Sequence, residues 1–306
     1  MSRLSSLNRL LWDLVELPSI NPSLEYKDAG LTGEEKVAIY LEDLAKASGI
    51  ESKRMKVLPG RQNLILRLKP SGKIKSRIML TPHMDVVPAE PDAFTPKIKN
   101  GCLFGRGACD TKGSIASFFH AFLRLSKETN RPKNTEINFV GLVDEEFGQA
   151  GSRLLAQKGP KADLAIAGEP TTLKVVSAHK GNLWIRLSTT GKAAHGSTPQ
   201  HGTNAITRMS PILEALTNDY PKLLSEKVHP LLGSPTISVG AIRGGSQPNV
   251  VPDSCQIDID RRTIPGETDE TVEKEMKHLF RKLKIKSPDF SSTRSVPCPP
   301  LDTDPS

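Results

Sequence analysis

The sequence of 306 residues has few cysteines and few aromatic residues, and both shortages limit what the protein can be. Its four cysteines, Cys102, Cys109, Cys255 and Cys298, form no Cys-x-x-Cys pair. They therefore match neither a zinc ribbon nor the disulfide framework of a secreted domain, and we expect a reducing, cytoplasmic location. Aromatic residues make up 5% of the chain, which argues against a surface that stacks nucleic-acid bases.

Long apolar runs are also lacking. No stretch approaches the roughly 18–20 apolar residues that a membrane span requires. Near the N-terminus, Leu4, Leu7, Leu11 and Leu14 have helical spacing, are interrupted by polar residues, and are followed by Pro18. This pattern predicts an amphipathic helix rather than a signal peptide.

Blocks of basic residues are absent, although the net charge is +8. Scattered lysines and arginines favour a solvated surface over a patch that grips a phosphate backbone. A less favoured alternative is that the positive field attracts small anionic substrates. We expect neither a nucleic-acid partner nor a membrane partner.

The length of the chain favours two domains, and its 37% of apolar residues is enough to bury a core. Up to residue 178, apolar strand patterns alternate with helical patterns, which predicts an α/β domain with a mostly parallel central sheet. The expected strands are 63–68, 77–81, 137–143 and 163–167, and the expected helices after the first are 33–48 and 113–127.

The pattern changes from residue 179 to residue 291. Alternating strands are expected at 183–189, 236–242 and 256–262, and helices at 204–216 and 268–283, with Thr268 as the N-cap of the last one. This order predicts a smaller α+β domain inserted into the chain.

Metal-competent side chains follow three strands of the first domain and precede one of its helices. They are His83, Asp85, Asp110, Glu145, Glu146 and Glu169. Ligands bind beyond the carboxyl ends of the strands in open parallel sheets, so these groups point to one rim. Carboxylates at short range repel one another, and one or two divalent ions would relieve that repulsion. Imidazole and carboxylates without cysteine suit catalytic zinc, with cobalt or manganese as alternatives.

Each of these segments has an ordinary structural explanation when it is taken alone. A histidine after a strand is often a hydrogen-bonded structural residue, and Asp-Glu-Glu after a strand is often a solvated loop. Four such segments at the same rim favour a metal site. For His120, His229 and His278, which have no such neighbours, we expect structural roles, and the role of His179 stays open.

Five motifs resemble those of the dinuclear zinc amidohydrolases, the family that includes acetylornithine deacetylase, succinyl-diaminopimelate desuccinylase and glutamate carboxypeptidase. In family order they are Pro82 to Pro88, Gly105 to Gly113, Asp144 to Glu146, Gly168 to Pro170 and Gly191 to Pro199. The resemblance runs from about residue 7 to residue 300. It implies a zinc-peptidase-like catalytic domain, with helices on both faces of its sheet, and an inserted ferredoxin-like lid that mediates dimerisation.

The resemblance also implies a ligand set for two zinc ions. His83 and Glu169 would bind one metal, Asp110 would bridge both, and Glu146 would bind the second. Residues 1–178 would then form the catalytic domain and 179–291 the lid, with 292–306 as the start of a return to the catalytic domain.

Two further residues of this rim receive catalytic roles from the resemblance. Asp85 would orient His83 through a hydrogen bond, which is how metal-bound histidines are usually held. Glu145 would be the general base, because a carboxylate outside the ligand set can take a proton from water and deliver it to the leaving nitrogen.

Three residues of the lid resemble substrate-contacting groups of the family. His195 is similar to the residue that reaches the scissile carbonyl of the partner subunit. Asn249 and Arg262 are similar to groups that hold the substrate carboxylate, a task for which an arginine fork is suited. A surface charge on a strand is an alternative role for Arg262.

One departure from the family pattern concerns the second metal. The family takes a further histidine ligand from a C-terminal segment, and no histidine follows His278 in this sequence. Either the ligand has been lost or the sequence continues beyond Ser306, and the proline-rich ending leads us to expect the second.

These observations predict an enzyme that cleaves a small N-acyl amino acid. Cys109-Asp110 and the run from Asp260 to Gly266 resemble acetylornithine deacetylase somewhat more than the desuccinylase, which implies hydrolysis of N-acetylornithine in arginine biosynthesis. A desuccinylase or dipeptidase of the same family is the alternative, and a non-catalytic relative that binds a metabolite is a third. Glu145 argues against the last, since a binding module does not need a free base beside the metals.

Overall fold

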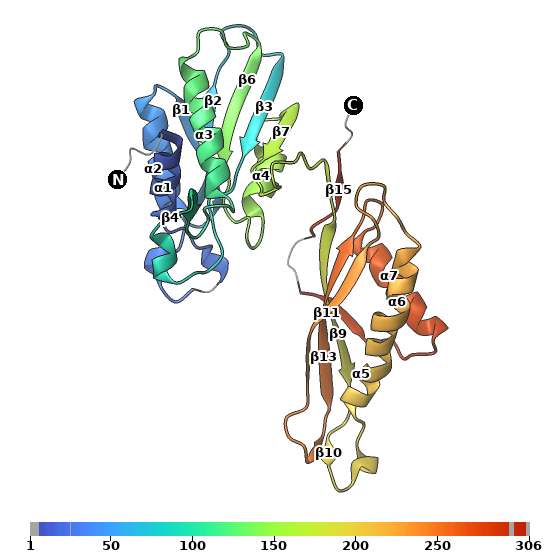
Figure 1. The fold of residues 1–306 in the computed structure, drawn as a ribbon. Coiled ribbons are helices and arrows are strands. Elements are labelled where there is room, and N and C mark those ends of the chain that lie inside the picture. Colours follow the sequence, from blue (N-terminus) through green and yellow to red (C-terminus); the bar gives the residue numbers. More distant parts are fainter. Residues whose placement is uncertain (1–5, 25, 294–296, 304–306) are drawn as a thin grey trace. The chain divides into compact units, whose positions relative to one another are not determined.

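The computed structural model describes residues 6–24, 26–293 and 297–303, and the chain divides into two compact units, Met1–Leu173 and Lys174–Ser306 (Figure 1). The division falls close to the domain boundary expected at residue 179. Residues 294–296 and 304–306, part of the 292–306 segment that was expected to return to the catalytic domain, lie outside the described residues. That return stays a prediction.

A five-stranded sheet in the order β1-β2-β6-β3-β7 forms the centre of the first unit. Its strands are β1 (Glu51–Leu58), β2 (Arg61–Leu68), β3 (Ser76–Thr81), β6 (Thr135–Gly141) and β7 (Leu164–Ala167). Neighbours β6, β3 and β7 are parallel, whereas β1 and β2 run antiparallel to the strand beside them. The parallel strands that were expected to carry the site are therefore adjacent.

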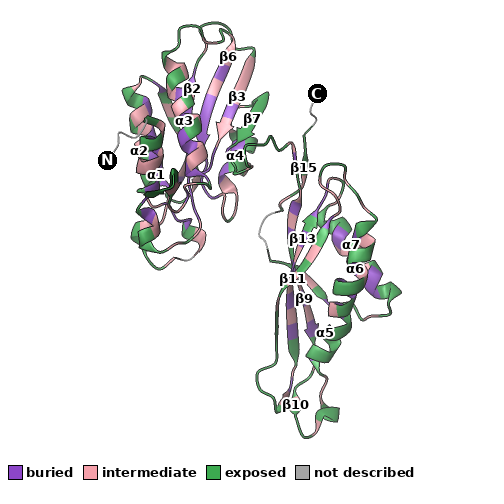
Figure 2. Ribbon diagram, in the orientation of Figure 1, coloured by how far each residue is buried: buried purple, intermediate pink, exposed green. Residues whose placement is uncertain are grey.

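Helices cover both faces of this sheet, because its central strands are apolar on both sides. Alternate residues of β2 separate the two cores: Leu64 and Leu66 face one core, and Ile65 faces the other. The first core is covered by α1 (Ser6–Val15), α2 (Glu35–Ala47) and α3 (Lys112–Lys127), and the second by α4 (Ala150–Lys158). Figure 2 shows the buried strand residues between helices whose outer faces are exposed.

Smaller elements complete the first unit. A hairpin is formed by β4 (Lys97–Lys99) and β5 (Cys102–Phe104), and single 3-10 turns occur at η1 (Pro22–Leu24), η2 (Ala29–Leu31) and η3 (Pro91–Phe94).

The second unit has the expected ferredoxin-like order of strands and helices. Its main elements are β9 (Gly181–Thr190), α5 (Ala205–Glu214), β11 (Thr236–Gly244), β13 (Ser254–Thr263), α7 (Asp269–Lys282) and β14 (Asp289–Ser292). The four strands form an antiparallel sheet in the order β11-β13-β9-β14. Inward-facing residues such as Leu187, Ile257 and Ile259 pack against α5, α7 and the helical segment between α5 and β11.

The remaining elements of this unit are short. They are η4 (Pro199–His201), a π-helical turn η5 (Ala215–Asp219), α6 (Tyr220–Ser225), and the two-residue pairs β8 (Ala178–His179) with β15 (Leu301–Asp302) and β10 (Ala194–His195) with β12 (Val250–Val251).

Two local predictions about the second unit are confirmed. Leu183, Ile185 and Leu187 of β9 are buried and alternate with more exposed residues, as a half-buried strand requires. Thr268 caps α7, because its hydroxyl accepts a hydrogen bond from the Thr271 amide at 3.2 Å while the Thr271 hydroxyl accepts one from the Thr268 amide at 2.8 Å.

In the part of the chain that the structure describes, no helix has both the length and the apolar character needed to cross a bilayer.

Replacing Phe119 by alanine should lower the free energy of unfolding of the first unit by about 3–5 kcal/mol. Phe119 on α3 is fully buried, and its ring packs edge-on against Phe139 of β6 with centroids 5.5 Å apart. Phe104→Ala is the matched control, because that ring is 56% exposed. The measurement is chemical denaturation; equal losses in the two variants would contradict the assigned core.

Candidate metal centre

Three parallel strands deliver the predicted ligands to one edge of the first unit's sheet. His83 comes two residues after β3, Glu145 and Glu146 come shortly after β6, and Glu169 comes two residues after β7. Asp110 lies in the loop directly before α3. Because β3 pairs in parallel with both β6 and β7, these segments leave the sheet at the same edge.

The side chains converge on the imidazole of His83. Its Nε2 lies 3.0 Å from Oδ1 of Asp110 and 3.9 Å from a carboxylate oxygen of each of Glu145 and Glu169. Donor atoms of His83, Asp110 and Glu146 all lie within 4.8 Å of one another. The structure therefore brings together all six residues of the first domain that the sequence singled out.

Crowding of negative charge is visible in the pKa values of the site. Burial, followed by the charges of neighbouring carboxylates, raises the pKa of Glu146 to about 7 and that of Glu169 to about 7. Burial would lower the pKa of His83, but the hydrogen bond with Asp110 and the contact with Asp85 outweigh it and raise that pKa to about 11.

Asp85 is buried and holds two parts of the site at once. Nδ1 of His83 lies 2.9 Å from the main-chain oxygen of Asp85 and 3.5 Å from its Oδ1, so Nε2 faces the other carboxylates. The two carboxylate oxygens of Asp85 also accept hydrogen bonds from the amides of Glu145, at 3.1 Å, and Glu146, at 3.0 Å. Sequence reasoning anticipated the contact with His83 but missed the anchoring of the Glu145–Glu146 turn.

A second group of buried polar residues lies next to Asp85, and the sequence analysis assigned it no role. It consists of Asn21, Glu34, Arg61 and Asp144. Asp144 stands in a quoted motif, but the other three come from distant segments that share no recognisable spacing with it.

The donor set fits a divalent metal. One imidazole nitrogen and several carboxylate oxygens converge, the imidazole is held by Asp85 from behind, and no thiol takes part among the described residues. Such a combination suits zinc and related divalent ions. The carboxylates of Asp110, Glu145 and Glu169 are partly exposed, so the site opens to solvent on the first unit.

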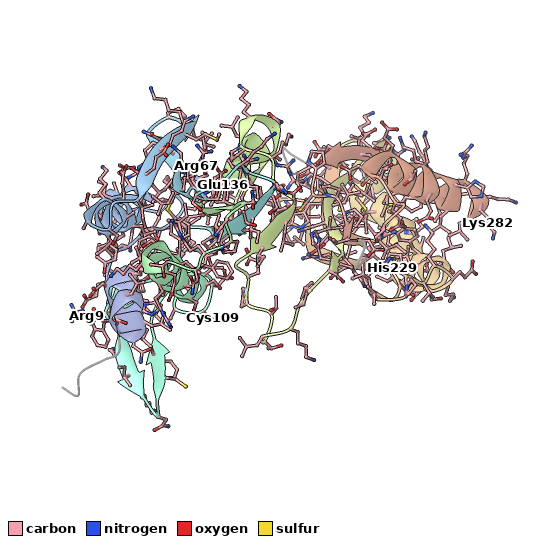
Figure 3. All side chains as sticks on the ribbon, turned by 90° about the horizontal axis from the view of Figure 1, so that it is seen from above. Arg9, Arg67, Cys109, Glu136, His229 and Lys282 are labelled. Atoms are coloured by element: carbon pink, nitrogen blue, oxygen red, sulfur yellow. The ribbon has the colours of Figure 1, made fainter. Side chains whose placement is uncertain are left out.

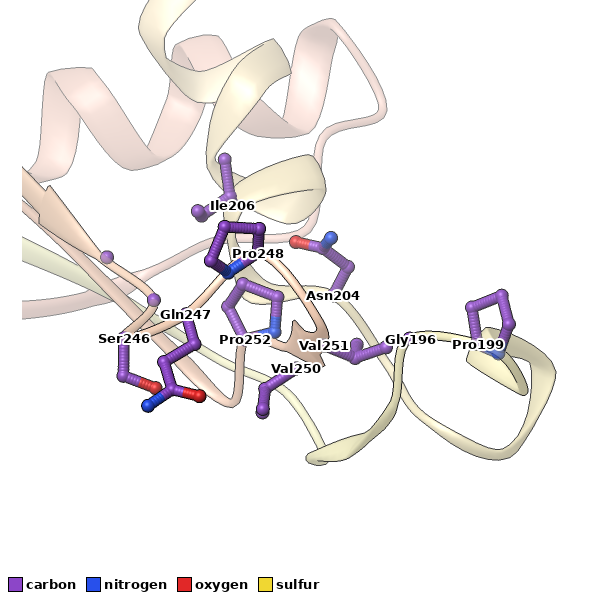
Figure 4. Close-up of a pocket in the computed structure, with 12 residues that line it drawn as sticks. Gly196, Pro199, Asn204, Ile206, Ser246, Gln247, Pro248, Val250, Val251 and Pro252 are labelled. Carbon is purple, nitrogen blue, oxygen red and sulfur yellow. The ribbon is translucent and has the colours of Figure 1, made fainter.

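In the second unit the structure brings His195 and Asn249 together. His195 is exposed on β10, which pairs with β12, and the amide of the next residue, Gly196, donates to the main-chain oxygen of Asn249 at 2.7 Å. Nδ1 of His195 lies 2.7 Å from the hydroxyl of Ser197. Beside them is a cavity of about 500 Å³, lined by Gly196, Ile206, Gln247, Val250 and neighbouring residues (Figure 4).

Arg262 lies elsewhere in the second unit. It is exposed near the end of β13, eight residues beyond Ser254, and its guanidinium pairs with Asp260 at 3.0 Å. At about 3.3 Å per residue, roughly 26 Å of strand separate it from the end of β13 that adjoins β12. Within this unit, therefore, Arg262 does not join His195 and Asn249.

Comparison with known proteins places these observations in a family. Residues 63–176 match the model of Peptidase family M28, and residues 177–288 match that of the Peptidase dimerisation domain. Acetylornithine deacetylase from Vibrio cholerae is 33% identical to the chain over 267 residues, which cover 84% of this chain and 68% of that protein.

Solved structures share the fold. Aminopeptidase PepT from Bacillus cereus superposes with a TM-score of 0.74 at 24% identity, covering 97% of this chain and 77% of its own. A dinuclear metal-binding peptidase of the M20 family from Bacillus subtilis gives a TM-score of 0.68 at 15% identity, covering 98% and 75%. Taken with the deacetylase relative and the dimerisation domain, they lead to one conclusion: the chain belongs to the M20 peptidase family and is a hydrolase.

Proposed function

We propose that the protein hydrolyses the amide bond of a small N-acyl amino acid, with N-acetylornithine as the preferred substrate, and that it uses two zinc ions. The observation that carries the proposal is the convergence of His83 with the carboxylates of Asp110, Glu145 and Glu169 within 3.9 Å of its Nε2. The deacetylase relative supports the choice of substrate.

Four side chains would hold the metals. His83 and Glu169 would hold one ion, Glu146 would hold the other, and Asp110 would be shared between the two. When bound, the ions supply Lewis acidity toward the substrate carbonyl and toward water. The raised pKa values of Glu146 and Glu169 support this assignment, because a cation would stabilise carboxylates whose charge is disfavoured by burial and, to a smaller extent, by their neighbours.

Glu145 acts as the general base in this proposal. Its backbone amide is fixed by Asp85, and its carboxylate lies at the rim of the site, near His83 but outside the proposed ligand set. From there it takes a proton from the attacking water and transfers it to the leaving nitrogen. Asp85 holds the His83 ring so that Nε2 faces the other carboxylates of the site.

The dimerisation domain supports a homodimer in which the second unit contributes to catalysis. His195 polarises the scissile carbonyl in the partner's site, and Asn249 and Arg262 bind the substrate carboxylate. The separation of Arg262 from Asn249 within one unit is compatible with contributions to different sites of the dimer. The four cysteines form no disulfide among the described residues, which suits a reducing compartment, and we assign the protein to the cytoplasm.

A desuccinylase or dipeptidase activity is the alternative within the family, because small acyl groups are distinguished by the shape of the pocket rather than by the catalytic residues. Turnover of N-acetylornithine should exceed that of N-succinyl-diaminopimelate and of simple dipeptides in kcat/KM, and chelation of the metal should abolish it. Preference for the succinyl substrate would reassign the substrate, and no hydrolysis of any of them with zinc added would refute the proposal.

Replacing Glu145 by glutamine should lower kcat by roughly 10²–10⁴-fold, the usual contribution of general acid–base catalysis, while the metal content is retained. The comparison is between steady-state kinetics and metal analysis of the same preparation. Glu128→Gln, which alters an exposed carboxylate beyond the end of α3, serves as the control and should be fully active. Normal turnover in Glu145→Gln would remove Glu145 from the mechanism.

Mixing two inactive variants should restore activity if His195 serves the partner's site. After subunit exchange between Glu145→Gln and His195→Ala, one site of each heterodimer has both residues intact. The readout is specific activity against mixing ratio, with each variant alone as the control. Heterodimers without regained activity would place His195 in its own subunit's site or outside catalysis.

A further inference from the structure

Behind the candidate metal centre lies a chain of buried polar side chains that contains none of the proposed metal ligands. Asn21, Glu34 and Asp144 are at most 3% exposed, and Arg61 is 8% exposed. They come from the loop after α1, the residue before α2, the segment after β6 and the start of β2. Such groups are costly to bury, so contacts that repay the cost point to a specific task.

Arg61 joins two of the carboxylates. Its Nε donates to Glu34 at 3.0 Å, its Nη2 also pairs with Glu34, and its Nη1 donates to Oδ1 of Asp144 at 3.0 Å. Glu34 in turn accepts a hydrogen bond from the backbone amide of Asp144 at 3.2 Å. Arg61 therefore holds the side chain of the residue that precedes Glu145, and Glu34 holds its backbone.

Asn21 joins Asp144 to Asp85. Its Nδ2 donates to Oδ2 of Asp85 at 2.8 Å and to Oδ1 of Asp144 at 3.1 Å, and its Oδ1 accepts from the amide of Ser23 at 2.9 Å. With both ends of the amide engaged, Asn21 has one orientation. It places two N–H hydrogens between carboxylates that would otherwise repel each other.

The network ends at the backbone of Glu145 and Glu146, the proposed general base and a proposed metal ligand. Asp85 accepts the amides of Glu145 and Glu146, and Asp144 has a φ of 67°, in the left-handed region that non-glycine residues rarely occupy. A residue in that region persists only where its surroundings hold it. Arg61, Glu34 and Asn21 supply that hold for Asp144.

We infer that Arg61 and Asn21 are positioning residues of the metal centre: through Asp144 and Asp85 they fix the Glu145–Glu146 turn in the conformation that presents the base and the ligand. This inference rests on the proposed function for the identity of that base and ligand. Neither residue makes a direct hydrogen bond to the proposed ligand side chains among the described contacts, so their effect is indirect.

The same strand offers a matched control. Arg67, six residues along β2, also pairs with a buried carboxylate, Glu136, which is 1% exposed and is further bound by Arg77. Figure 3 shows the Arg67 and Glu136 side chains together and away from Cys109, the neighbour of Asp110. Arg67→Lys and Arg61→Lys thus make the same change at two arginines of one strand that each pair with a buried carboxylate, and only one pair adjoins the site.

The experiment compares Arg61→Lys, Asn21→Leu and Arg67→Lys with the unaltered protein. Lysine keeps the charge but lacks the fork that spans Glu34 and Asp144. We expect Arg61→Lys and Asn21→Leu to lower kcat about 10–100-fold with KM changed less than about 3-fold, because small displacements of catalytic groups act on the reaction step. Zinc affinity, measured by competition with a chelator, should fall roughly 10–100-fold. Arg67→Lys should leave both quantities unchanged.

Thermal unfolding separates this effect from a general loss of structure. Arg61→Lys and Arg67→Lys should both remain folded at the assay temperature, and if Asn21→Leu fails to fold, Arg61→Lys decides alone. Unaltered kcat and zinc affinity in Arg61→Lys, or equal losses in Arg67→Lys, would overturn the inference. If the unaltered protein binds zinc but hydrolyses no N-acyl amino acid, the proposed function fails, and the zinc affinities alone decide whether the network positions the ligand turn.

Discussion

Repulsion among carboxylates held at one edge of a sheet is the constraint that organises the first unit. Parallel β3, β6 and β7 place Asp85, Glu145, Glu146 and Glu169 around a single imidazole, and Asp110 completes the group. Two kinds of contact make this arrangement possible. His83 and backbone amides stabilise the charge of Asp85 and lower its pKa despite its burial, and Arg61 forms ion pairs with both Glu34 and Asp144. For Glu146 and Glu169, burial outweighs the charge of His83 and raises the pKa of each carboxyl to about 7, so both favour a further cation beside them.

Much of this arrangement could be predicted because its signals are local. Apolar runs such as Ile78 to Leu80 predict strands of the central sheet, and the metal-competent side chains come shortly after these runs in the sequence. The ferredoxin-like unit could be predicted equally well. Buried and more exposed residues alternate along its strands, and Thr268 is a recognisable N-cap of α7. The resemblance to a known family added the assignment of metal-ligand and general-base roles, which the spacing of the residues alone does not predict.

What could not be predicted depends on contacts between distant segments. The edge strand β1 contains four charged residues in eight and is nowhere fully buried, so it lacks an apolar run. Helix α4 is only nine residues long and buries just Gly151 and Leu155, so its pattern is too short to predict a helix. Arg61 lies 27 residues from Glu34 and 83 from Asp144, distances at which no periodicity links them.

Two adjacent arginines in β13 differ in burial because successive side chains of a strand point to opposite faces of the sheet. Arg261 points into the core of the second unit, where it is fully buried between Tyr220 and Glu267, while Arg262 points outward and pairs with Asp260. Both positions hold an arginine, but only the side chain of Arg262 is accessible to a substrate. Arg261 instead forms the buried end of a charged cluster with Glu267, Glu275 and the partly exposed Lys227.

The convergence of three strand ends on His83 would also tie binding of the proposed metal to folding. The ligand atoms come from segments that meet only when β3, β6 and β7 have paired, so an unfolded chain offers no comparable site. An ion that binds only the folded form stabilises it by about 2.7 kcal/mol at a free concentration of 100 times its Kd. The supply of metal in the cell would then set not only how many molecules are active but also how many remain folded.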